Sequence, residues 1–218
     1  MSWQIEFVDI AGIVKGASEG AGLGNKFLTN IRQTDAIVHV VRCFVDDDII
    51  HVDGNVDPLR DVEIISLELI LADLAQIEKK LEKVSRDFLP YLRMFCYIVT
   101  LTVFVTGFSN HKNFLDFINL CTQAKKDKKN SPEELVALEK VNQALMSGKA
   151  ARQASLTVEE LDLVKSLMLL TLKPVIYAAN VADSDLATGN ELSRKLTEFA
   201  KSEGSVVVIV SAQVTDHR

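Results

Sequence analysis

Cysteine is scarce in this chain, and its scarcity excludes two kinds of cross-linked fold. The 218 residues contain three cysteines, Cys43, Cys96 and Cys121, an odd number at wide spacing. Such cysteines suit neither a disulfide framework nor a CxxC metal site. The simpler interpretation is a protein of a reducing compartment.

Positive charge is also in short supply. Lys and Arg number 24 against 30 Asp and Glu, which gives a formal net charge of −6. This balance argues against a protein that coats nucleic acid over its whole surface, but it leaves room for a local basic patch. The first residues have no basic stretch before an apolar core and are not rich in Arg and Ser, so they predict neither a secretory signal nor a transit peptide. Since 48% of the residues are hydrophobic, disorder is excluded as the dominant state.

Short apolar runs alternate with helical patterns along the chain. The runs rich in Val and Ile are apolar on consecutive residues, as buried strands covered on both faces are. They are Ile5–Ile10, Ala36–Cys43, Pro174–Ala179 and Val206–Val210. The helical patterns are Gly24–Gln33, Asp61–Lys83, Pro132–Met146, Thr157–Leu170 and Glu191–Lys201, the last stopping near Gly204. This alternation predicts an α/β fold with a mostly parallel sheet.

The middle of the chain differs from its two ends. From Leu81 to Ser147 the strand pattern of the sheet does not recur, and residues 124–129 form a basic run, Ala-Lys-Lys-Asp-Lys-Lys. The sequence therefore predicts a helical insertion between the second and third strands. This divides the chain into residues 1–80, 81–147 and 148–218.

One segment of the insertion, Phe88–Gln123, does not fit a solvated helical hairpin. Its longest uncharged apolar stretch, Met94–Phe108, is about 15 residues, short of the roughly 20 that a spanning helix needs. Its β-branched and aromatic residues favour a strand over a helix. Three interpretations remain open here: a buried strand, a weak membrane anchor, or foreign sequence.

Asp9-Ile10-Ala11-Gly12 ends the first apolar run with a D-x-x-G pattern. After a buried strand this is the third nucleotide motif of P-loop GTPases, in which the Asp reaches Mg²⁺, usually through water, and the Gly N–H faces the γ-phosphate. The same residues also make an ordinary strand-to-turn sequence. Taken alone, they favour the simpler interpretation.

Two later strands end in motifs of the same class. Asn180-Val181-Ala182-Asp183 stands where GTPases carry N-K-x-D, whose carboxylate pairs with the guanine edge, and Val181 replaces the Lys. Ser211-Ala212 stands where GTPases place a Ser-Ala backbone against the base. Each motif alone is explained by turn formation. Together all three stand at carboxyl ends of predicted parallel strands, in GTPase order, and predict a nucleotide site at that edge.

The phosphate cradle of such a site, G-x-x-x-x-G-K-[ST], occurs nowhere in the sequence. The main source of binding energy for the β- and γ-phosphates is therefore missing. The run Gly20–Gly24 is no dinucleotide fingerprint, because position 25 is Asn25; it fits either a switch that orders on γ-phosphate binding or a plain connection. Of the histidines, His39 lies inside a strand and is interpreted as a core residue, and His51 lies in a loop, either as a functional residue or as an ordinary surface residue.

These residues closely resemble the Obg-like ATPase family, also called YchF. The resemblance covers roughly Gln4–Arg86 and Ala124–Thr215. Its main runs are Ile5–Ser18, Gly22–Leu28, His39–Phe44, Ile49–Val52, Val56–Pro58, Leu67–Leu69, Ala72–Leu74, Leu170–Pro174, Asn180–Val181 and Glu203–Ser205.

The resemblance implies a P-loop NTPase domain with a G-domain-like parallel sheet and an inserted helical coiled-coil hairpin. A small TGS domain is expected beyond this chain's end. It also implies binding and hydrolysis of ATP or GTP with Mg²⁺. Asp9 and Gly12 are then expected near Mg²⁺ and the γ-phosphate, and Asn180, Val181, Asp183, Ser211 and Ala212 around the base. In this family a hydrophobic residue, here Ile13, replaces the Gln that orients the attacking water, which leaves His51 as the catalytic candidate.

The resemblance further implies association with the ribosome through its large subunit, a cytoplasmic monomer and no membrane. A plastid or mitochondrial location is the alternative. Asp183 stands where the family usually has Glu, which puts the base preference in doubt. The chain resembles an internal fragment without the P-loop and the TGS domain. In such a fragment the strands that bear Asp9 and Asn180 would both lack the P-loop strand that lies between them, which leaves strand edges unpaired. We therefore expect the chain to fold poorly and to hydrolyse little nucleotide. Within this family the Phe88–Gln123 run suggests a translated intron or a gene-model error.

The alternative function is a non-catalytic module that binds the ribosome or RNA through the basic coiled coil.

Overall fold

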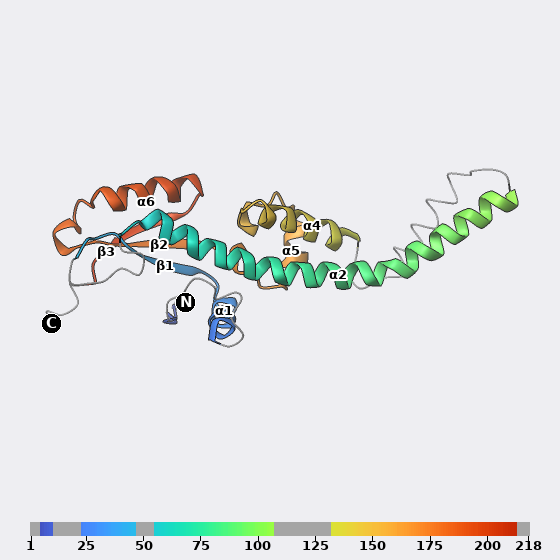
Figure 1. The fold of residues 1–218 in the computed structure, drawn as a ribbon, viewed down its shortest axis with the longest axis horizontal. Helices are drawn as coiled ribbons and strands as arrows, with labels where there is room; N and C mark the ends of the chain where they lie inside the picture. Colours follow the sequence, from blue (N-terminus) through green and yellow to red (C-terminus); the bar gives the residue numbers. More distant parts are fainter. Residues whose placement is uncertain (1–4, 11–22, 47–54, 107–131, 213–218) are drawn as a thin grey trace, which may run out of the picture. The chain divides into compact units, whose positions relative to one another are not determined.

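The computed structural model describes residues 5–10, 23–46, 55–106 and 132–212 (Figure 1). The helices and strands are, in chain order, α1 (Leu23–Gln33), β1 (Ile37–Arg42), α2 (Pro58–Thr106), α4 (Pro132–Met146), α5 (Val158–Lys165), β2 (Val175–Asn180), α6 (Glu191–Ser202) and β3 (Val206–Val210). Three short 3₁₀ turns join them, η1 (Ala151–Gln153), η2 (Leu170–Leu172) and η3 (Asp183–Asp185).

The chain divides into two compact units. Residues 1–72 and 169–218 form the unit that contains the sheet, and residues 73–168 form a helical unit. α4 and α5 both belong to the helical unit, so this unit extends about twenty residues beyond the end of the predicted insertion at residue 147. Only the sheet unit carries the strand ends at which nucleotide motifs were predicted.

The sheet of the first unit is parallel, with the order β1-β2-β3. Arg42 of β1 pairs with Asn180 of β2, and Asn180 pairs with Val210 of β3, so the three carboxyl ends are level. This confirms the predicted α/β class. The expectation that a P-loop strand would lie directly beside the Asn180 strand is wrong, because β2 pairs with β1 on one side and with β3 on the other. A further strand could join the described sheet only at the outer edge of β1 or β3.

One face of the sheet is covered. Tyr177 and Ala179 of β2 are buried in a core that α6 supplies with Leu196 and Ala200 and that Val62 of α2 completes. The opposite face exposes four valines, Val38, Val40, Val206 and Val208. The prediction of strands covered on both faces therefore holds for β2, in which Tyr177 and the next two residues are buried, but it is wrong for β1 and β3, where each exposed valine alternates with a better-buried neighbour.

The predicted first strand, Ile5–Ile10, is not a strand in the structure. Residues 5–10 have no regular secondary structure, and Ile5 and Phe7 are 78% and 81% exposed. An extended segment needs a neighbouring strand to bond its backbone, and no described strand pairs with this one. Ile10 instead packs against a cluster that contains Leu28 of α1 and Leu170.

The segment Phe88–Gln123 is helical as far as the structure describes it. α2 runs without a break from Pro58 through Thr106, so the buried-strand interpretation, one of the three left open, is wrong for residues 88–106. Residues 107–123 lie outside the described ranges. Extending an existing helix adds one hydrogen bond per residue, whereas β-branched side chains disfavour a helix only slightly. Among the residues that the structure describes, no helix combines the length and hydrophobicity that a membrane span requires.

Helix ends follow the capping signals in the sequence. Thr157 caps α5 and forms a capping box with Glu160. α6 ends at Ser202, two residues before Gly204, whose φ is +72°. α5 ends at Lys165, earlier than the predicted Leu170, and the chain then turns through Met168, a non-glycine residue with φ of +50°. Lys173 donates hydrogen bonds from Nζ to the carbonyl oxygens of Arg32, at 3.0 Å, and Thr34, which fastens the end of α1 to the start of β2.

Candidate functional site

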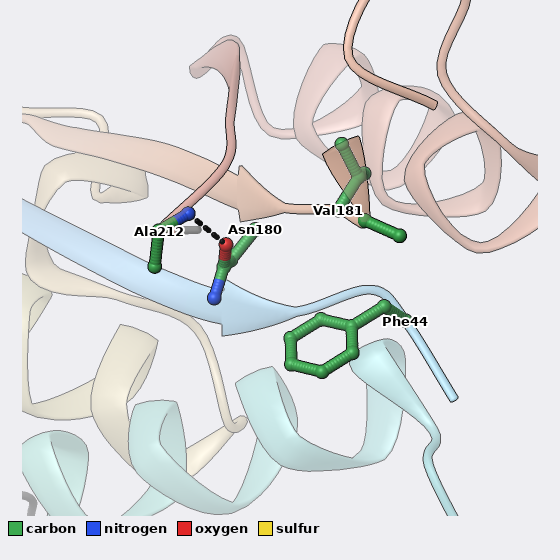
Figure 2. Close-up of a pocket in the computed structure, with 5 residues that line it drawn as sticks. Phe44, Asn180, Val181 and Ala212 are labelled. Atoms are coloured by element: carbon green, nitrogen blue, oxygen red, sulfur yellow. Dashed lines mark hydrogen bonds between the residues drawn. The ribbon is translucent and has the colours of Figure 1, made fainter. Parts of the chain in front are cut away.

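Asn180, the last residue of β2, connects the ends of all three strands. Its Oδ1 accepts a hydrogen bond from the backbone N–H of Ala212 at 3.1 Å, as Figure 2 shows. Its backbone oxygen accepts the N–H of Cys43, which follows β1, at 2.7 Å. The next residue, Val181, donates its N–H to Val210 at the end of β3 at 2.9 Å. One asparagine and its neighbour thus fix the carboxyl edge of the whole sheet.

Asp183 lies beside the Ser-Ala motif. It begins the 3₁₀ turn η3, and its carboxylate accepts a hydrogen bond from the Ser211 hydroxyl. The side chain of Asp183 is exposed, so a ligand at this edge can reach it. The structure therefore brings together the five residues that the sequence placed around a base: Asn180, Val181, Asp183, Ser211 and Ala212.

A small hollow opens between these strand ends (Figure 2). Its walls are Phe44, Asn180, Val181, Ala182 and Ala212. Its volume of about 30 Å³ is far below the roughly 300–1,000 Å³ of a pocket that encloses a ligand.

Phe44 was not predicted as a site residue. The signal was available, because Phe44 directly follows Cys43 at the carboxyl end of β1 and this end lies at the same edge as those of β2 and β3. Arg42 contacts the Phe44 ring: its guanidinium carbon lies 4.7 Å from the ring centroid, and its Nε donates to the Phe44 carbonyl at 3.1 Å. A second nitrogen of Arg42 donates to the Asp46 carbonyl at 3.3 Å, so this cation also orders the residues after the ring.

Of the remaining predicted site residues, Asp9, Gly12 and His51, the structure describes only Asp9. Asp9 is exposed, and its neighbour Ile10 packs in the cluster that also contacts Ile37, the first residue of β1. Asn180 is the last residue of β2, so the structure does not bring Asp9 to the base motifs. The physical reason for the position of Asp9 is that residues 5–10 pair with no described strand, so no backbone ladder holds them alongside the sheet. Gly12 and His51 lie outside the described residues, as does the basic run at 124–129.

The perturbed groups near the sheet belong to its core. Burial lowers the pKa of His39 to about 4, against a smaller opposing effect of the Asp61 charge. Burial, supported by Asp61, raises the pKa of the Cys43 thiol to about 11. His39 lies 5.8 Å from Tyr177 between ring centroids, which supports its interpretation as a packed core residue. Across the described ranges, no group of three or more His, Cys, Asp or Glu residues is arranged to hold a metal ion.

Comparisons with known proteins identify the family of this chain. Residues 2–86 match the family described as 50S ribosome-binding GTPase. The chain is 43% identical over 211 residues to the ribosome-binding ATPase YchF of Bacillus subtilis and 41% identical over 210 residues to that of Escherichia coli O157:H7, and each match covers 96% of this chain. The chain belongs to the YchF family.

A solved YchF structure supports the same assignment. The YchF GTPase of Schizosaccharomyces pombe is 36% identical to this chain, with a TM-score of 0.62 over 91% of this chain and 45% of that one. The chain spans about half the length of the curated YchF relatives it matches, 48% for those of B. subtilis and E. coli. The predicted family and fold are thereby confirmed.

Proposed function

We propose that the carboxyl edge of this sheet is the base-recognition part of an ATP- or GTP-binding site of the YchF type. The observation that carries the proposal is the convergence of Asn180, Asp183 and Ala212 from the ends of two parallel strands, with Phe44 from a third. Carboxyl ends of parallel strands are where open α/β sheets bind ligands. YchF relatives named as ATPases and a GTPase support a purine nucleotide as that ligand.

Each residue of the edge offers a contact that a purine can use. The Phe44 ring supplies a flat apolar surface, on which a base stacks irrespective of its identity. The Asp183 carboxylate accepts hydrogen bonds, so it pairs with two N–H groups of guanine or with the amino group of adenine. Ser211 also donates to one oxygen of this carboxylate, which leaves the second oxygen and a further lone pair of the first for a base.

We propose Asp9 and Gly12 as the contacts to Mg²⁺ and the γ-phosphate, and His51 as the residue that positions the attacking water. Mg²⁺ keeps several waters and takes one or two carboxylates plus phosphate oxygens, so a single exposed carboxylate such as Asp9 suits it. Bound there, the ion would neutralise charge on the phosphates. This assignment requires the segment at residues 5–10 to reach the carboxyl edge of the sheet, which gives it a separate test from the base site.

The sequence lacks a G-x-x-x-x-G-K-[ST] cradle, so we propose weak binding and slow hydrolysis for this chain. Equilibrium binding of ATP, GTP and CTP to wild type and to Asp183→Ala tests the base site. We expect dissociation constants near ~1 mM, purines preferred over CTP, and loss of that preference in the variant. Equal affinity for all three nucleotides in wild type would contradict the proposal. Micromolar affinity or rapid hydrolysis would contradict the weak-binding part alone.

We also propose that the chain takes part in ribosome binding, as the names of its relatives suggest for those proteins. Co-sedimentation with purified ribosomal subunits, with and without ATP, tests this. Association with the large subunit that depends on nucleotide would support the base site as its regulator. Association without any nucleotide dependence would instead favour a non-catalytic binding module.

A further inference from the structure

Asn190 makes more contacts than its position at a helix start requires. It caps α6: its Oδ1 accepts the N–H of Ser193 at 2.9 Å, and the Ser193 hydroxyl in turn accepts the Asn190 N–H at 2.9 Å. Its Nδ2 donates two more hydrogen bonds, to the Cys43 carbonyl at 2.7 Å and to Asp185 Oδ2 at 2.9 Å. The amide therefore uses its acceptor and both of its donor hydrogens.

The first of these donor contacts controls the residue before Phe44. Both backbone polar groups of Cys43 are held, because its N–H donates to the Asn180 oxygen at 2.7 Å and its carbonyl accepts from Asn190 at 2.7 Å. Cys43 is fully buried, with a relative exposure of 0%. The Cys43 carbonyl belongs to the peptide bond that joins Cys43 to Phe44. Holding this carbonyl therefore fixes the backbone position from which the Phe44 side chain reaches the hollow.

The second donor contact controls the turn that carries Asp183. Asp185 closes η3, and its own N–H donates to the Ala182 carbonyl at 2.9 Å. The Asp185 carbonyl also accepts the N–H of Gly189 at 2.7 Å, which closes a tight loop back to Asn190. Holding the Asp185 carboxylate therefore fixes the far end of the turn whose first residue is Asp183.

Capping alone does not explain the choice of asparagine. Asp and Ser cap helices about as well as Asn, but neither can donate to a carbonyl and a carboxylate while accepting a backbone N–H. We propose that Asn190 is a positioning residue for base recognition, which holds Phe44 and the Asp183 turn at a fixed separation on either side of the hollow. This inference rests on the proposed function of that edge, although Asn190 itself does not line the hollow.

Two substitutions separate positioning from capping. Asn190→Ser keeps a neutral helix cap but is too short to donate hydrogen bonds to Cys43 and Asp185. Asn190→Asp also keeps the cap, but it has no donor for these two partners and places a second carboxylate beside Asp185. Thr157→Ala is the matched control, because it removes the cap of α5 in the other unit. The full chain is used throughout, with amide hydrogen exchange at Cys43 and Phe44 and binding of ATP and GTP as the two measurements.

We expect about tenfold faster exchange at these two amides and about tenfold weaker purine binding in both Asn190 variants, and neither change in Thr157→Ala. Unchanged exchange and affinity in folded Asn190→Ser would overturn the inference, as would equal changes in Thr157→Ala. If the wild-type chain binds no purine nucleotide, that result overturns the proposed function by itself, and the exchange data alone then decide whether Asn190 positions Cys43 and Phe44.

Discussion

The side chain of Asn180 holds the backbone of Ala212, with 3.1 Å between Oδ1 and the amide nitrogen, across 32 residues of sequence. This hydrogen bond joins the end of β2 to the residues that follow β3. Because Ala212 is exposed, water can replace the lost acceptor, so we expect Asn180→Ala to lower the free energy of unfolding by less than about 1 kcal/mol. The local effect should be larger: amide exchange at Ala212 should rise, whereas Asn180→Asp, which keeps an acceptor, should retain wild-type exchange.

The buried His39 predicts a loss of stability in acid. Its pKa is lowered to about 4 in the folded chain from 6.5, so the folded state binds fewer protons than the unfolded state between these values. Its contribution is therefore complete above pH 6.5 and is lost as the pH falls toward 4, by about 2–3 kcal/mol for a ring that keeps some exposure.

Chemical denaturation of wild type and His39→Leu at several pH values measures this contribution. The difference in unfolding free energy between the two proteins should change by that amount between pH 6.5 and 4. A difference that stays constant over this range would show that His39 is accessible to protons in the folded state.

The helical unit contains a buried ion pair. Lys80 Nζ lies 2.8 Å from Glu134 Oε1, and the side chains are only 20% and 5% exposed. Lys80→Met removes this partner from a buried carboxylate and should cost about 3 kcal/mol, whereas the double variant Lys80→Met/Glu134→Leu should recover most of the loss. Thermal unfolding measures both.

A surface pair provides the control for this cycle. Lys195 and Glu191 lie at a similar distance, 2.9 Å, but their side chains are 53% and 78% exposed. Lys195→Met should leave the melting temperature nearly unchanged. If both single variants melted alike, burial would not be the origin of the effect at Lys80.

Gly189 should resist substitution more than Gly148 does. Both have positive φ, +67° and +75°, so alanine strains the backbone at either position by about 1 kcal/mol. At Gly189 an added Cβ would also lie 2.8 Å from Ser193 Oγ and 3.2 Å from Ile209 Cδ1, whereas at Gly148 no atom lies within 4 Å. Gly189→Ala should therefore lower stability by about 1 kcal/mol more than Gly148→Ala, and equal losses would show that the α6 cap moves aside at no cost.

The parts of the fold that depend on local signals could be read from the sequence. β3 and α4 have the predicted bounds because a continuous Val/Ile run and a Ser-Pro-x-Glu start leave few alternatives. The convergence of Asn180 with Ala212 also followed from the sequence, because parallel strands place their carboxyl ends at one edge.

The parts that depend on partners could not be read in the same way. The Ile5–Ile10 run has the composition of a strand but no described neighbour to pair with, so its apolar pattern alone does not make it one. Residues 88–106 are rich in strand-forming residues, but they extend a helix that has already been nucleated. Phe44 could have been predicted from its place just after a strand end, whereas Asn190 could not, because its contacts with Cys43 and Asp185 are visible only in the structure.

Photo-cross-linking with an azidopurine triphosphate tests most directly whether the edge of β2 and β3 recognises a purine. The labelled peptides are identified by mass spectrometry, with and without excess unlabelled ATP, and CTP serves as the competitor that should fail. We predict labelling of peptides that contain Phe44, Asn180–Asp183 or Ser211–Ala212, suppressed by ATP. Labelling confined to the helical unit, or labelling that CTP suppresses as well as ATP does, would contradict a purine site at this edge.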